Sequence, residues 1–89
     1  MKIKFKRNIR LLVRLDCYED LWDNEQEWEF DQGVELEVYD IIMGEPRKLR
    51  HGKKKRTMHF ADIFLKQGRT EQWPDYIHMV PEDCFEIID

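Results

Sequence analysis

A strict alternation of apolar and acidic residues in the segment EFDQGVELEV most constrains the fold of this chain. In its second half valine and leucine alternate with glutamate. Because successive side chains of a β-strand point to opposite faces, this period of two predicts a half-buried strand over residues 34–43. Gly33 predicts a turn before that strand, since glycine tolerates a positive φ. Gly44 and Pro46 predict its end.

The same period of two recurs in other segments and predicts further strands. Apolar residues alternate with Lys and Arg over residues 2–6 and 9–15. Shorter strands are predicted over residues 76–80 and 85–88, separated by a break at residues 81–83. A helix over residues 9–22 is the alternative for the second segment, because several of its leucines fit one helical stripe.

Three stretches have less regular patterns. Residues 16–29 are so rich in acidic side chains that we expect a long irregular loop. Residues 57–68, TMHFADIFLKQG, fit either a strand or a short helix at 59–67 that is closed by Gly68. Their aromatic and β-branched content favours the strand. Residues 69–75 are predicted to form a turn.

The length and composition predict one small domain over residues 1–89. Apolar residues make up 42% of the chain, so it can form a core and does not have the composition of a disordered protein. No run of about 18 apolar residues occurs, and the basic N-terminus lacks the apolar stretch of a signal peptide. We therefore expect a cytoplasmic protein without membrane contact, in which Cys17 and Cys84 are reduced thiols, with a disulfide as the alternative.

Two segments resemble small barrels of the Src-homology-3 (SH3) type. EFDQGVELEV is similar to their diverging turn, in which an aromatic residue and a glycine precede an alternating strand. MVPEDCFEII is similar to their end, where a strand meets a proline, makes one 3₁₀ turn and leaves as the closing strand. The resemblance covers residues 9–43 and 76–88 and implies an all-β fold, a small five-stranded barrel with elongated loops. Of the peptide-binding groove of that family, Pro81 has a counterpart here.

Charge is arranged in blocks along the sequence. Residues 2–14 carry six Lys or Arg and no acid, and residues 16–45 carry twelve acids and no Lys or Arg. The segment RKLRHGKKKR then carries seven bases around Gly52 and predicts an exposed hairpin tip. Its cations could bind nucleic acid or an acidic protein; alternatively, the basic and acidic blocks neutralise each other in the fold. These cations are Arg47, Lys48, Arg50, Lys53, Lys54, Lys55 and Arg56.

Aromatic residues supply a second candidate surface, because exposed Trp and Tyr dominate the energy of protein interfaces. Burial in the core is the alternative, and it is favoured for Trp28. The candidate residues for a protein partner are Tyr18, Trp22, Trp28, Trp73 and Pro81.

No catalytic or metal-ligating spacing occurs among the His and Cys residues, and no cofactor motif is present. Cys84 lies beside acids, which disfavour its thiolate. We therefore expect a non-enzymatic interaction module that binds another protein through the acidic Trp-bearing loop or the basic hairpin. The alternative is a nucleic-acid-associated accessory domain that uses residues 47–56.

Overall fold

The computed structural model describes residues 1–15, 25–70 and 73–88, and within these ranges it is all-β. The described residues form nine strands and one 3₁₀ helix, so the predicted all-β class is confirmed and the predicted five strands are wrong. The elements are β1 Lys2–Phe5, β2 Ile9–Arg14, β3 Glu25–Phe30, β4 Glu35–Met43, β5 Arg47–His51, β6 Lys54–Met58, β7 Phe60–Thr70, β8 Trp73–Pro81, the 3₁₀ helix Glu82–Cys84, and β9 Phe85–Ile87.

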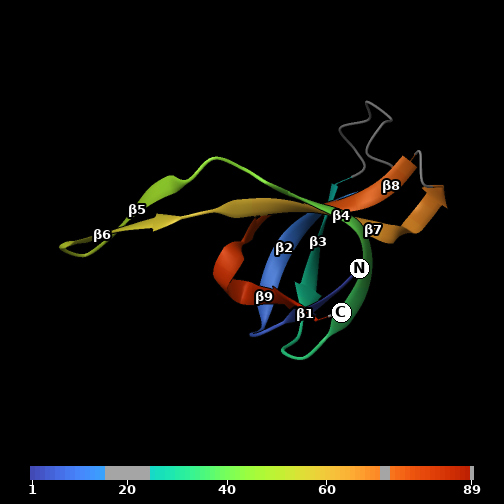
Figure 1. Ribbon diagram of the computed structural model, residues 1–89, viewed down its shortest axis with the longest axis horizontal. Helices are drawn as coiled ribbons and strands as arrows, with labels where there is room; N and C mark the ends of the chain where they lie inside the picture. Colours follow the sequence, from blue (N-terminus) through green and yellow to red (C-terminus); the bar gives the residue numbers. More distant parts are fainter. Residues whose placement is uncertain (16–24, 71–72, 89) are drawn as a thin grey trace.

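All strands except β5 and β6 join one antiparallel sheet, in the order β3-β2-β8-β7-β4-β1-β9. β4 holds the two parts of this sheet together, because it pairs with β1 near its start and with β7 towards its end. A register shift between Val38 and Asp40 separates the two stretches, and such shifts bend a strand. Figure 1 shows β4 curving along one side of the body. Within the described residues, β3 and β9 stay at opposite edges, so the sheet is curved without closing into a five-stranded barrel.

The core lies inside this curve and is built at a period of two. Ile3 and Phe5 of β1 are fully buried, as are Ile63 and Leu65 of β7. The rings of Phe5 and Phe30 stack with their centroids 4.7 Å apart. Burial of alternate side chains is what the sequence pattern predicted for half-buried strands. Other core residues are Leu11, Val13, Val38, Ala61, Ile77, Val80, Cys84 and Phe85.

The two turns that the sequence predicted at residues 30–33 and 81–83 are present as local structures. Gly33 has a φ of 89°, and the Val34 amide donates to the Asp31 carbonyl at 3.1 Å, which closes the predicted turn. At the other end β8 stops at Pro81, and the 3₁₀ helix leads directly into β9. The expected break after residue 80 is therefore a single helical turn.

The two helical alternatives are wrong for the described residues. Residues 9–14 form β2, and the ambiguous stretch belongs mainly to β7. β7 is paired along both edges, with β4 and β8, so sheet hydrogen bonds replace the helical ones that residues 59–67 would make. The turn predicted over residues 69–75 is wrong for its described residues, because β7 extends to Thr70 and β8 begins at Trp73.

The acidic segment differs from its prediction as well. Residues 25–29 were expected to lie in an irregular loop, but they form β3 and pair with β2. Arg10 lies opposite Glu29, and Arg14 lies opposite Glu25. Opposite charges that face each other across a strand pair stabilise it, so the acidic side chains do not prevent pairing. The rest of that predicted loop, residues 16–24, lies outside the described residues.

Candidate nucleic-acid interface

The basic segment forms a hairpin that is separate from the main sheet. β5 and β6 pair with each other in a register that runs from Arg47 opposite Met58 to His51 opposite Lys54. Gly52, with a φ of 64°, takes the first central position of the two-residue turn, where hairpins favour glycine. Figure 1 shows the hairpin projecting from the body along the longest axis of the molecule. The predicted exposed hairpin tip is confirmed.

Most cations of this hairpin have no partner among the residues that the structure describes. All seven are exposed to solvent. Arg56 makes an ion pair, with its Nη2 atom 3.4 Å from Asp83 Oδ2, and the Arg47 guanidinium carbon lies 6.0 Å from the centre of the Phe60 ring. Five further cations make no ion pair or hydrogen bond to any described residue: Lys48, Arg50, Lys53, Lys54 and Lys55.

The placement of charged and apolar side chains on the hairpin lowers its stability. Arg50 lies directly opposite Lys55, and like charges in that position repel each other. Met58 at the root is buried, whereas Leu49 is 39% exposed and packs into no core. Two-stranded hairpins without a packed face are marginally stable in water. An anionic partner would remove the repulsion, so the arrangement suits a ligand with many negative charges.

The N-terminal cations have a different environment. Lys2 Nζ lies 3.7 Å from Glu37 Oε1, and Arg14 Nε lies 2.6 Å from Glu25 Oε1. Arg10 lies within 4 Å of carboxylates on β3, and Arg7 Nη2 is 3.2 Å from Asp83 Oδ1. Mutual neutralisation of the basic and acidic blocks is therefore confirmed for Lys2, Arg10 and Arg14, whereas Arg7 pairs with an acid near the C-terminus. Lys4 and Lys6 make no ion pair with a described residue. For the hairpin, Asp83 is the one acid of the described residues that pairs with a cation, Arg56. The acids of residues 16–24 lie outside the described residues, so neutralisation of the hairpin by that loop stays a prediction.

The aromatic candidates do not form one described surface. Trp28 is half-buried on β3, and its ring lies 6.3 Å from Phe30, so it packs against the core as expected. Pro81 ends β8 opposite Phe60. Trp73 begins β8, but its side chain lies outside the described part of the structure. Tyr18 and Trp22 also lie outside the described residues, so their role at a protein interface stays a prediction.

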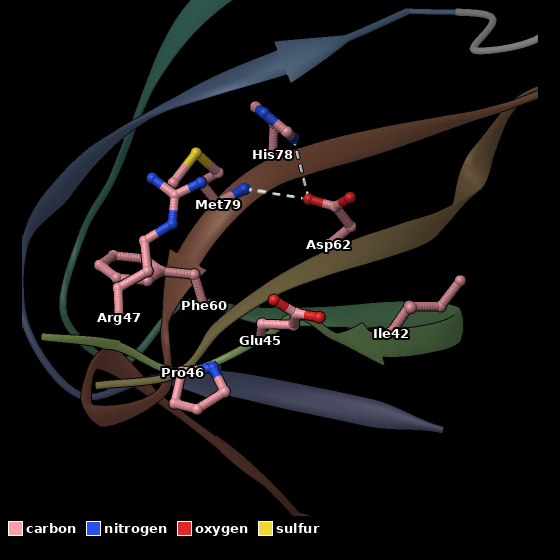
Figure 2. Close-up of a pocket in the computed structure, with 9 residues that line it drawn as sticks. Ile42, Glu45, Pro46, Arg47, Phe60, Asp62, His78 and Met79 are labelled. Carbon is pink, nitrogen blue, oxygen red and sulfur yellow. Dashed lines mark hydrogen bonds and ion pairs between the residues drawn. The ribbon is translucent and has the colours of Figure 1, made fainter. Parts of the chain in front are cut away.

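A cavity of about 350 Å³ lies at the root of the hairpin, and nothing in the sequence pattern indicated it. Figure 2 shows its walls: Arg47 and Phe60 lie on one side, and Asp62 and His78 lie on the other. A β-bulge shapes this cavity. Between the pairs Ala61–Val80 and Ile63–Ile77, β7 has one residue, Asp62, and β8 has two, His78 and Met79. Met79 has a φ of 51°. The remaining lining residues are Ile42, Gly44, Glu45 and Pro46.

The polar groups of this cavity stabilise the bulge. Asp62 Oδ1 lies 2.9 Å from His78 Nδ1 and accepts a hydrogen bond from the Met79 amide at 3.1 Å. A carboxylate that orients a histidine is one half of a nucleophile-activating arrangement. However, the lining residues that the structure describes include no Ser, Thr or Cys to serve as the nucleophile. The contact between Asp62 and His78 is therefore explained by its role in stabilising the bulge.

Cys84, the thiol within the described ranges, is not an activated nucleophile. It is free and buried in the core. Burial raises the pKa of Cys84 to about 11, and Asp83 adds to this rise, while Arg7 and Lys6 oppose it. Among the described residues, no group of three or more His, Cys, Asp or Glu is arranged to hold a metal ion.

Comparisons with known proteins assign no family to the chain, because no family model, curated protein or solved structure matches it. The described part of the chain also contains no helix with the length and hydrophobicity needed to cross a membrane.

Proposed function

We propose that this protein is a non-enzymatic interaction module that binds nucleic acid through its basic β-hairpin. The observation that carries the proposal is a set of five cations on a projecting ribbon that have no partner among the described residues: Lys48, Arg50, Lys53, Lys54 and Lys55. Cations of this kind neutralise phosphates and release the counterions that surround a nucleic acid.

The projection of the hairpin separates these cations from the acidic body. The chain has a net charge of −4, which by itself would repel a polyanion. Strands of five residues, like β5 and β6, span about 17 Å. The Debye length at physiological ionic strength is about 8 Å, so the field of the body is strongly screened at the tip. A negatively charged domain can therefore present a local positive site.

The composition of the hairpin favours nucleic acid over protein as the partner. Protein interfaces draw most of their energy from buried aromatic anchors, and residues 47–58 contain no Trp, Tyr or Phe. Phosphate contacts need only cations. Binding of a protein partner through the Trp-bearing segment stays a separate prediction, since its residues 16–24 lie outside the described residues.

Two finer expectations belong to the same proposal. We infer that the body is a curved-sheet relative of the SH3-type barrel, supported by the turn at Gly33 and the 3₁₀ helix after Pro81. A cytoplasmic location is supported by the free thiol of Cys84, since thiols stay reduced in that compartment.

Salt dependence of binding tests the proposal. Fluorescence anisotropy with a labelled duplex should give a slope of about −4.5 in log K against log salt, if five phosphates are neutralised. Affinity should then fall roughly 500-fold between about 50 and 200 mM salt. Replacing Lys48, Arg50, Lys53, Lys54 and Lys55 by Gln should bring the slope close to zero.

The matched control removes five cations from the N-terminal strands instead, so that both variants have the same net charge. Its substitutions are Lys2→Gln, Lys4→Gln, Lys6→Gln, Arg7→Gln and Arg10→Gln. We expect this control to keep most of the slope of the unmodified protein. Equal losses in both variants, or no salt-dependent binding by the unmodified protein, would overturn the proposal.

A further inference from the structure

We propose that the hairpin enters the major groove of duplex DNA with one particular face, formed by Lys48, Arg50, Lys55 and Thr57 and called here the open face. This inference rests on the proposed function and adds the class of nucleic acid, the groove and the face. It follows from the register of β5 and β6, the contacts of the opposite face and the composition of the tip.

The register divides the hairpin cations between two faces. Residues directly opposite each other in an antiparallel pair share a face, and neighbours along a strand alternate. Lys48 opposite Thr57 and Arg50 opposite Lys55 therefore define the open face. The other face, called here the anchored face, contains Arg47, Leu49, Lys54, Arg56 and Met58.

Contacts with the body distinguish these faces. On the anchored face Arg56 pairs with Asp83, Arg47 lies over the Phe60 ring, and Met58 is buried at the root. On the open face, Lys48, Arg50 and Lys55 make no ion pair or hydrogen bond to any residue that the structure describes. The anchored face thus fixes the hairpin on the body, and the open face is left to meet a ligand.

The dimensions of a two-stranded ribbon select the groove. The major groove of B-DNA is about 12 Å wide and admits such a ribbon, whereas the minor groove is about 6 Å wide. Proteins that bind and bend DNA through the minor groove frequently insert apolar wedges between base pairs. The turn here consists of Gly52 and Lys53, so its tip has no wedge.

The same geometry discriminates between kinds of nucleic acid. The major groove of A-form RNA is deep and narrow and excludes protein elements of this size. Single strands are usually held by stacking on large aromatic side chains, and residues 47–58 contain no Phe, Tyr or Trp. Duplex DNA is therefore the expected ligand.

Two triple variants with equal loss of charge test the face. The open-face variant is Lys48→Gln, Arg50→Gln, Lys55→Gln, and the anchored-face variant is Arg47→Gln, Lys54→Gln, Arg56→Gln. The first should lower the salt slope for a DNA duplex by about 2.7, which corresponds to three phosphates. The second should lower it by about 0.9, because Lys54 is the cation of that set without a partner among the described residues.

Chemical probing tests the groove. Methylation by dimethyl sulfate occurs at guanine N7 in the major groove and at adenine N3 in the minor groove. We expect the unmodified protein to protect guanine N7 and leave adenine N3 reactive. An RNA duplex of the same sequence should bind at least about tenfold more weakly than the DNA duplex.

The outcomes separate this inference from the proposed function. Equal effects of the two triple variants, protection of adenine N3 alone, or equal affinity for the RNA duplex would overturn the groove-and-face inference while nucleic-acid binding stands. Absence of binding to every nucleic acid tested would overturn both.

Discussion

Two basic segments of similar composition differ in how many of their cations form ion pairs. The N-terminal segment carries six cations and the hairpin carries seven. On β1 and β2 and the turn between them, Lys2, Arg7, Arg10 and Arg14 form ion pairs with carboxylates. On β5 and β6, Arg56 is the cation that pairs with a carboxylate of the described residues. Strand pairing explains the difference, because β1 and β2 lie beside the acidic strands β4 and β3. Among the described strands, β5 and β6 pair with each other and with no third strand.

The comparison shows that clustered charge in a sequence does not by itself indicate a binding site. The N-terminal segment serves the fold, since three of its six cations, Lys2, Arg10 and Arg14, pair with carboxylates on neighbouring strands. The hairpin contributes little to the stability of the fold, and most of its cations stay exposed to solvent, where a ligand can reach them. Asp83 lies between the two, because one oxygen pairs with Arg7 and the other pairs with Arg56.

The largest expected difference between the two regions is in hydrogen exchange. Amides of β1 and β2 lie in the main sheet, so their exchange should require global unfolding. Amides that pair β5 with β6 should exchange by local opening, about 10³-fold faster or more. Native-state exchange followed by NMR measures both sets in one sample. Equal protection of both sets would show that the hairpin belongs to the same cooperative unit as the body.

Removal of an apolar side chain should have an effect in one region and little in the other. Ile3 of β1 is fully buried, and Leu49 of β5 is 39% exposed. Ile3→Ala should lower the free energy of unfolding by about 2–5 kcal/mol, because it leaves a cavity. Leu49→Ala should change it by no more than about 0.5 kcal/mol. Urea denaturation measures both values, and a large loss for Leu49→Ala would contradict the separation of the two regions.

Neutralising one arginine in each region gives a smaller contrast. Arg14 pairs with Glu25 and donates from Nη1 to the Tyr76 hydroxyl at 3.0 Å. Arg14→Gln should therefore cost about 0.5–1 kcal/mol of stability, discounted for the partial exposure of the pair. Arg50→Gln should cost nothing or add slight stability, because it removes the repulsion with Lys55. A larger loss for Arg50→Gln than for Arg14→Gln in thermal denaturation would refute this assignment.

The smallest expected effect is at the acid shared by the two segments. Asp83→Asn releases Arg56 and Arg7 from exposed ion pairs, which should cost less than about 1 kcal/mol. The freed Arg56 should steepen the salt slope of DNA binding by about 0.9. Anisotropy titrations of the variant and the unmodified protein measure this change. A shallower slope would show that the Asp83 contact positions the hairpin for binding.

The sequence predicted those features that depend on local pattern. The period of two located β1, β2 and β4, and Gly52 located the hairpin, because both signals lie within a few adjacent residues. The helix alternative over residues 59–67 could not be excluded from the sequence, since the strand depends on two neighbours that are distant in the chain. β3 was missed for the same reason, because its acids are neutralised by Arg10 and Arg14 across the strand pair.

The site was predictable in part. The seven cations of the hairpin were identified from their clustering, but which of them keep a free charge depends on contacts with Asp83 and Phe60. The cavity at the root requires the bulge opposite Asp62, and the register of β7 against β8 cannot be read from either strand by itself. The pairing of strands that are distant in the sequence therefore determines the features of the site that the local pattern could not predict.

The most direct test of the central claim is an NMR titration of the ¹⁵N-labelled protein with a DNA duplex at about 150 mM salt, a concentration at which exposed charges are well screened. The structure predicts saturable amide shifts confined to residues 47–58, with the amides of residues 2–14 unchanged. Shifts centred on residues 2–14, or no shifts at all, would contradict the claim that the hairpin is the basic segment available for binding.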